Sequence, residues 1–232
     1  MKNIHIFYHI WQINNWKDIF EEQMRAIEDS GIVEAAKTIT ITVCGKEDLP
    51  NLPEKSEVIR FEHNSNLKDI FKLIMQTAEK NPNSYICFFH SKGITHCGLP
   101  AIHWRQYLTY WTITRWKTNV ELLAEADCVG TNWNVDNRFG RYPHFSGTFW
   151  WARGSFILGL DASYVDSDDR MLKEFWIGSS IMKKGAVVAE IHCSEMNDGF
   201  NARHYWEDYP AHLYHGAENA KIFRYSPMQS NT

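Results

Sequence analysis

A chain of 232 residues, 44% hydrophobic and 22% charged, is long enough to bury one large core, and its composition excludes disorder and low complexity. Its 24 basic and 28 acidic residues give a net charge of −4 without a basic stripe, which excludes a phosphate-neutralising nucleic-acid surface. No apolar run reaches the ~18 residues of a membrane span, and the N-terminus has no signal-peptide pattern. The five cysteines form no CxxC pair, so we expect a soluble, cytoplasmic protein with reduced thiols.

The first half of the chain alternates predicted strands and helices. Strands are expected over 4–9, 39–43 and 58–61, where β-branched and aromatic residues cluster. Helices are expected over 16–30 and from about residue 67 to the Asn-Pro pair at 81–82, because apolar residues recur there at helical spacing. This alternation predicts an α/β fold with a mixed, mostly parallel central sheet flanked by helices.

The most apolar segment, residues 85–89, predicts a central strand because a run without polar residues suits a strand that is covered on both faces. A short polar motif follows it at once: His90, Ser91, Lys92 and Gly93. Ligands of open α/β sheets bind outside the carboxyl ends of the strands, so this motif is expected at the site.

The second half is predicted as a Trp-rich helix over 102–123, a strand ending near Asn132, a strand over 147–152, a helix over 169–183 and a last strand over 186–191. From residue 193 onward the periodicity is weak, and we expect loops and short helices that cover the site.

The segment order "FFHSKG", "DCVGTNW", "HFSGTFWWARGSFI" and "KEFWIGSSIMKKGAVV" resembles glycosyltransferases of the GT-A fold, especially small ones in polysaccharide biosynthesis. The resemblance covers about residues 4–191. It implies a single GT-A-like domain over 1–232, with a nucleotide-binding half (about 1–132) and an acceptor and catalytic half (about 133–232). It also implies an inverting hexosyltransferase that moves a sugar from a nucleotide-sugar donor, a UDP- or dTDP-sugar, to a hydroxyl of a glycan acceptor.

The chain departs from that family at the end of the central strand, where most members carry an Asp-x-Asp motif that holds a metal ion. His90, Ser91 and Lys92 stand there instead. Lys92 can neutralise the leaving diphosphate in place of a metal, while the Ser91 hydroxyl and the Gly93 N–H bind phosphate oxygens. We therefore expect no cofactor beyond the donor; Mn²⁺ or Mg²⁺ held by His90, or an exposed turn without function, are the alternatives.

Other residues at predicted strand ends are assigned to the ligand. We expect Tyr8, His9 and Asn66 at the donor, with Tyr8 stacking on the base; helix capping is the alternative for Asn66. Since neighbouring strand residues face opposite sides, one of Trp150 and Trp151 points toward the core and the other toward the site. The predicted sugar and acceptor pocket comprises Asn132, Trp133, Ser146, Gly147 and Trp150.

Glu174 is the predicted general base, because inverting transfer needs a carboxylate on the acceptor side of the anomeric carbon. Gly178, one turn further along the helix, would leave room for a ligand beside an apolar face formed by Met171, Leu172, Phe175 and Met182. A solvated Glu in the first turn of a helix is the alternative. If Glu174 is not the base, Asp169 is the next candidate.

Two further functions compete with glycosyl transfer. A non-catalytic sugar- or nucleotide-binding domain of GT-A shape could keep the pocket and lose the chemistry. A nucleotidyltransferase should carry a Gly- and Arg-rich phosphate loop near the N-terminus, where "FYHIWQINNW" stands instead.

Overall fold

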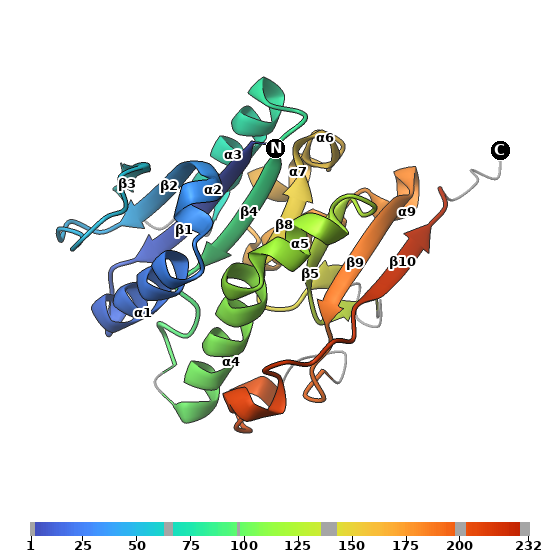
Figure 1. Cartoon of the computed structure of the whole chain (residues 1–232). Helices are drawn as coiled ribbons and strands as arrows, with labels where there is room; N and C mark the ends of the chain where they lie inside the picture. Colours follow the sequence, from blue (N-terminus) through green and yellow to red (C-terminus); the bar gives the residue numbers. More distant parts are fainter. Residues whose placement is uncertain (1–2, 63–66, 97, 136–142, 198–202, 228–232) are drawn as a thin grey trace.

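The computed structural model describes residues 3–62, 67–96, 98–135, 143–197 and 203–227. Its centre is an eight-stranded sheet in the order β10-β9-β5-β8-β4-β1-β2-β3 (Figure 1). Strands β3, β2, β1, β4, β5 and β9 run in one direction, and β8 and β10 run in the other. The strands are β1 (Ile4–Trp11), β2 (Ala36–Cys44), β3 (Ser56–Phe61), β4 (Tyr85–His90), β5 (Cys128–Thr131), β8 (Trp150–Arg153), β9 (Ala186–His192) and β10 (Lys221–Tyr225). The short strands β6 (Trp133–Asn134) and β7 (His144–Phe145) form a separate pair.

Helices cover both faces of the sheet, and this explains why its central strands β1 and β4 are buried along almost their whole length and are mostly apolar (Figure 1). In β1, Ile6 and Tyr8 pack with α1 and α4, whereas Phe7 between them packs with α3 on the opposite face. One layer is α1 (Trp16–Asp29), α4 (Leu99–Thr109), the π-helix Tyr110–Thr114 and α5 (Trp116–Leu122). The other contains α3 (Lys68–Lys80), α6 (Gly154–Ile157), α7 (Ser163–Asp166) and α8 (Arg170–Phe175). The predicted fold class is confirmed.

The two halves of the chain share one sheet. Strand β8 of the second half lies between β4 and β5 of the first and pairs antiparallel with both. The order of the strands along the chain reverses at β1. Strands β2 and β3 lie on one side of β1, and the next strand of the chain, β4, lies on the other side. This reversal marks the crevice at which open α/β sheets bind ligands. The proposed boundary near residue 132 stays a prediction.

Two helical segments differ from the sequence prediction. The helix expected over 102–123 is interrupted by a π-helical turn, Tyr110–Thr114. The helix expected over 169–183 breaks into α8, a 3-10 turn Trp176–Gly178 and α9 (Ile181–Lys184). Only glycine fits at position 178 in the 3-10 turn, because a Cβ there would overlap the carbonyl oxygen of Pro143. The space beside Gly178 is therefore filled by backbone, which corrects the expectation that it leaves room for a ligand.

The sequence prediction also missed β10, an edge strand that pairs antiparallel with β9. Its burial is partial, with Phe223 and Tyr225 half-buried between exposed neighbours, so its hydrophobic pattern is weak. The remaining elements are α2 (Ile32–Ala35) and two 3-10 turns, Arg203–Tyr205 and Ala211–Leu213. In the described part of the chain, no helix combines the length and apolarity needed to cross a membrane.

Candidate functional site

A cavity of about 140 Å³ opens at the carboxyl ends of β1 and β4, at the reversal of strand order. His9 and His90 are paired in register at these strand ends, and both line the cavity. Ser91, Lys92 and Gly93 continue the wall directly after β4. The sheet rule therefore predicted the position of this polar motif correctly, although its role in ligand binding stays a prediction.

The backbone of the motif is tied to β1. The Ser91 N–H donates to the His9 carbonyl at 2.9 Å, and the Trp11 N–H donates to the Ser91 hydroxyl at 3.3 Å. Ser91 is thus held between the two strands with its hydroxyl already accepting one hydrogen bond. The Lys92 ammonium lies 4.0 Å from the centre of the Trp104 ring, a cation–π arrangement inside the cavity.

His9 and His90, two of the histidines that line the cavity, are neutral near pH 7. Burial lowers the pKa of His9 to about 4, although Asp69 acts in the opposite direction. Burial also holds the pKa of His90 well below its usual range, and the charge of Lys92 adds to this effect. Since a carbonyl oxygen only accepts, the His90 Nε2 carries the proton that it donates to Gly147 at 3.1 Å. The Nδ1 of His90 is then the nitrogen with a free lone pair.

Glu174 and Arg170, both on α8, also line the cavity. Asp169 caps this helix by accepting a hydrogen bond from the Met171 N–H at 2.8 Å. Glu174 is one turn further on, with 26% of its side chain exposed, and forms an ion pair of 3.8 Å with Arg170. The cavity is therefore lined by two cations, Lys92 and Arg170, and by the Glu174 carboxylate.

Sequence reasoning did not identify the aromatic part of the cavity. Trp104 of α4 and Tyr205 of the C-terminal segment meet edge to face at 4.8 Å, and the Lys92 ammonium lies 5.7 Å from the Tyr205 ring. Trp11, the last residue of β1, also lines the cavity. Trp11 could have been found, because it stands two residues after His9, at the carboxyl end of the same strand. Tyr205 could not, because no sequence signal places the C-terminal segment against Lys92.

Two aromatic residues assigned to the ligand lie in the core instead. Tyr8 is fully buried and stacks on Phe89 of β4 at 4.5 Å, so its ring faces α1 rather than a nucleobase. Trp150 and Trp151 are both buried, on opposite faces of the sheet. The expectation that one of them faces the site is wrong, because helices cover both faces of β8.

The predicted acceptor pocket is largely closed. Asn132 is fully buried and accepts a hydrogen bond from the Ser194 N–H at 2.8 Å. The Trp133 side chain donates to the Tyr225 hydroxyl at 2.8 Å, and Ser146 accepts from Asn134. Of this group, Gly147 comes nearest to the cavity, because its carbonyl binds His90 and the next residue, Thr148, lines the cavity. Asn66 lies outside the described residues.

The apolar face expected on the 169–183 helix is only partly buried. Phe175 is in the core, but Met171 and Met182 are exposed because the segment is broken into separate short elements. Within the described ranges, no group of three or more His, Cys, Asp or Glu side chains is arranged to hold a metal ion. If a metal ion binds in the cavity, the His90 Nδ1, which has a free lone pair, is a candidate ligand for it.

Comparisons with known proteins give a family and two distant structural likenesses. The profile of a family described as a domain of unknown function (DUF8361) matches residues 5–164. The crystal structure of 4-diphosphocytidyl-2C-methyl-D-erythritol synthase aligns with a TM-score of 0.38 and 9% identity over 75% of this chain and 84% of its own. The bifunctional IspDF from Campylobacter jejuni aligns with a TM-score of 0.36 and 8% identity over 74% of this chain and 47% of its own. No curated protein matches the sequence. Neither structure is similar enough to inform the site.

Proposed function

The chain belongs to the DUF8361 family, whose description assigns no activity, and we propose that it is a glycosyltransferase that uses a nucleotide-sugar donor at this cavity. One observation carries the proposal. A lysine and a carboxylate, Lys92 and Glu174, line the same cavity at the reversal of strand order. Transfer of a sugar from a diphosphate to a hydroxyl needs a positive charge at the leaving group and a base at the attacking group.

The proposed step is a single displacement with inversion. The acceptor oxygen attacks the anomeric carbon of the donor sugar and forms the new glycosidic bond, while the bond from that carbon to the diphosphate oxygen breaks. The electron pair of the broken bond leaves with the diphosphate, whose added charge Lys92 stabilises. The proton of the acceptor hydroxyl passes to the Glu174 carboxylate.

Lys92 is suited to this task because its charge is held without a counter-ion. In the described part of the chain, no carboxylate lies within ion-pair distance of its ammonium group, which rests on the face of Trp104 at 4.0 Å. An aromatic face is a weaker partner than a carboxylate, so an arriving phosphate displaces it at low cost. We therefore propose that transfer does not need a divalent metal and continues in EDTA. If EDTA abolishes transfer and Mn²⁺ restores it, His90 becomes the candidate ligand.

The alternative is a sugar- or nucleotide-binding domain without catalysis. The ion pair of Glu174 with Arg170 favours it, because a carboxylate engaged by a neighbouring guanidinium is a poorer base. Arg170 has 71% of its side chain exposed, however, so it can move away when a substrate enters. The two functions differ in one measurable property, the turnover of the donor.

The deciding experiment incubates the protein with a panel of UDP-, dTDP- and other nucleotide sugars, with and without glycan acceptors, and measures the release of nucleoside diphosphate. An enzyme releases it repeatedly from at least one donor, faster with an acceptor, whereas a binding domain binds a donor without turnover. Glu174→Gln is the matched control, since it keeps the size of the side chain and removes its basicity. Binding without release by the unmodified protein would reject the proposed enzyme in favour of the binding domain.

A further inference from the structure

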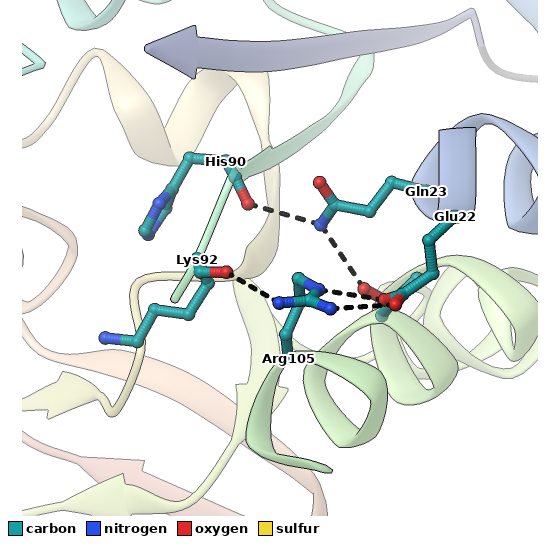
Figure 2. A network of polar contacts seen from close by, with 6 residues as sticks. Glu22, Gln23, His90, Lys92 and Arg105 are labelled. Atoms are coloured by element: carbon teal, nitrogen blue, oxygen red, sulfur yellow. Dashed lines mark hydrogen bonds and ion pairs between the residues drawn. The ribbon is translucent and has the colours of Figure 1, made fainter. Parts of the chain in front are cut away.

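Side chains of two helices, α1 and α4, donate hydrogen bonds to backbone carbonyl groups of the loop after β4 (Figure 2). Gln23 of α1 donates from its Nε2 to the His90 carbonyl at 3.2 Å. Arg105 of α4 donates from its Nη1 to the Lys92 carbonyl at 3.4 Å. Two of the four carbonyl groups of the motif, those of His90 and Lys92, are therefore each bound by a side chain from a helix.

The two donors are themselves fixed in a buried network. Gln23 is fully buried and also donates to the Thr109 hydroxyl at 3.3 Å. Arg105 is 4% exposed and binds both carboxylate oxygens of Glu22, at 2.9 and 2.8 Å. A bidentate Arg–carboxylate pair fixes the plane of the guanidinium, so its remaining nitrogen points at the loop in one direction (Figure 2). The Arg105 side chain is buried but 31% of the Glu22 side chain is exposed, and an ion pair of this kind is weak evidence for stability.

The contact with Arg105 fixes the direction of the next N–H group. Because the peptide bond is planar and trans, the Gly93 N–H points opposite to the Lys92 carbonyl, away from Arg105. Figure 2 shows the side chains of His90 and Lys92 extending from the loop on the side opposite to their carbonyl groups. Gly93 lines the cavity, and among the described residues its N–H has no hydrogen-bond partner. The positive φ of Gly93, +84°, is one that other residues rarely adopt.

We propose that Arg105 and Gln23 are positioning residues that preset this loop as an anion site. They turn the carbonyl oxygens of the loop away from the cavity, so that the Gly93 N–H and the Lys92 ammonium are both available to one phosphate group. Successive backbone groups with their N–H ends toward a concavity are a known form of anion site. The class of ligand is a phosphate or diphosphate; that it belongs to a nucleotide sugar rests on the proposed function.

The test removes the network without leaving a buried charge. Arg105→Met alone would leave the Glu22 carboxylate without its partner, so the variant is Arg105→Met with Glu22→Gln, which also leaves the net charge unchanged. Glu22→Gln alone is the matched control, because it keeps Arg105 and its bond to the Lys92 carbonyl. Gln23→Met, which removes the second donor and also conserves charge, is an independent variant should the double variant fail to fold.

The measurement is a titration with inorganic pyrophosphate that follows the Gly93 amide signal of ¹⁵N-glycine-labelled protein by NMR. Pyrophosphate should shift this signal in the unmodified protein and in Glu22→Gln with affinities within about threefold of each other. The double variant should bind roughly tenfold or more weakly, the effect of losing one well-directed hydrogen bond to a charged group. Gln23→Met should weaken binding in the same direction. Thermal unfolding of each variant shows whether lost binding reflects lost structure.

Equal pyrophosphate affinity in the double variant and the unmodified protein would overturn the proposal, as would a Gly93 signal that pyrophosphate does not move. The result is separable from that for the proposed function. If pyrophosphate binds as expected but no nucleotide sugar is turned over, the loop is an anion site and only the assignment of glycosyl transfer fails.

Discussion

The carboxyl ends of β1 and β4 and those of β5 and β9 lie at the same edge of one sheet and carry similar residues. His9 and His90 stand at the first pair of ends, and Asn132 and His192 stand at or just beyond the second. The first pair borders the cavity. At the second, Asn132 and His192 are buried under the C-terminal segment and α4.

We call the first pair of strand ends, which borders the cavity, the open end, and the second pair the closed end. The closed end is filled by a hydrogen-bonded network. The Tyr107 hydroxyl contacts the Nδ1 of His192 at 3.0 Å and the Oδ1 of Asn132 at 3.3 Å. The Ser194 hydroxyl contacts the Nε2 of His204 at 2.8 Å. Polar residues at strand ends therefore serve two purposes in one fold: at the open end they are available to a ligand, and at the closed end they satisfy one another. Substitutions should cost activity at the open end and stability at the closed end.

The largest effect is expected for Glu174→Gln at the open end. The variant keeps the shape of the side chain and loses the base, so glycosyl transfer should fall by roughly 10²- to 10⁴-fold while donor affinity is retained. Transfer is measured by release of nucleoside diphosphate at saturating donor and acceptor. Asp168→Asn, which removes a carboxylate just before α8 and outside the cavity lining, is the control and should transfer normally. Near-normal transfer by Glu174→Gln would place the base elsewhere, with Asp169 next to be tested, or indicate a retaining mechanism.

Lys92→Ala should reduce turnover by roughly 10²-fold or more, the effect of removing one preorganised charge stabiliser. The midpoint of thermal unfolding should change little, because the partners of the ammonium group among the described residues are aromatic faces, and a cation–π contact contributes about 0.5–1 kcal/mol. Lys80→Ala, at the exposed end of α3, is the matched control for charge. A variant that is destabilised but turns over donor at the normal rate would assign Lys92 a structural role and contradict the comparison.

Stability should depend on pH in the same way at the open end and at the closed end. Each end has a histidine whose pKa is lowered by burial, and this effect does not depend on function. Burial lowers the pKa of both His9 and His192 from 6.5 to about 4. Between these values the unfolded chain binds a proton that the folded chain does not, so stability is full above pH 6.5 and falls as the pH decreases toward 4. Each histidine should account for about 2 kcal/mol of lost unfolding free energy between pH 7 and pH 5.

Urea unfolding at several pH values measures this loss in the unmodified protein, in His9→Asn and in His192→Asn. Asparagine can replace the Nδ1 of either ring as a hydrogen-bonding group but does not titrate. Each variant should show a flatter dependence on pH than the unmodified protein. An unchanged dependence in one variant would mean that this histidine is already charged in the folded chain.

The sequence was sufficient to predict the open end, because this prediction depends only on residues that are neighbours in the chain. The apolar run before His90 and the rule for strand ends were sufficient to place the motif. Periodicity also located most helices and strands, since it records which side of each element is buried. It did not tell that Tyr8 faces the core while His9 faces the cavity, because both faces of β1 are buried and each carries an aromatic residue, Tyr8 on one and Phe7 on the other.

The closed end and the support of the loop depend on contacts between distant parts of the chain. Asn132 was assigned to a pocket because nothing near it in sequence shows that Ser194 and His204 cover it. Arg105 and Glu22 are 83 residues apart, and each alone resembles an ordinary surface charge. Arg105 and Glu22 can be recognised as an ion pair only once α1 and α4 are known to pack against the same face of the sheet.

The smallest effect is expected for Tyr107→Phe at the closed end. The change removes the hydroxyl that contacts Asn132 and His192 but leaves the ring packed against Tyr209 and Tyr214. Asn132 keeps its bond from the Ser194 N–H, so the loss should be about 1 kcal/mol of unfolding free energy, the usual net value of a buried hydrogen bond. Because Tyr107 does not line the cavity, turnover should stay within about twofold of normal.

The matched control is Tyr110→Phe, one turn further along, whose hydroxyl accepts only a long, exposed bond of 3.5 Å from the Gly216 N–H. Its unfolding free energy should change by less than about 0.5 kcal/mol, as is usual for exposed sites. Urea unfolding and donor turnover are measured on both variants at the same pH. If Tyr107→Phe loses turnover without losing stability, the closed end acts on the reaction, and the division between an open functional end and a closed structural one fails. The Trp104 ring stacks on His204 of the closed end at 5.2 Å and also contacts the Lys92 ammonium in the cavity. A change at the closed end would therefore reach the cavity through this pair of rings.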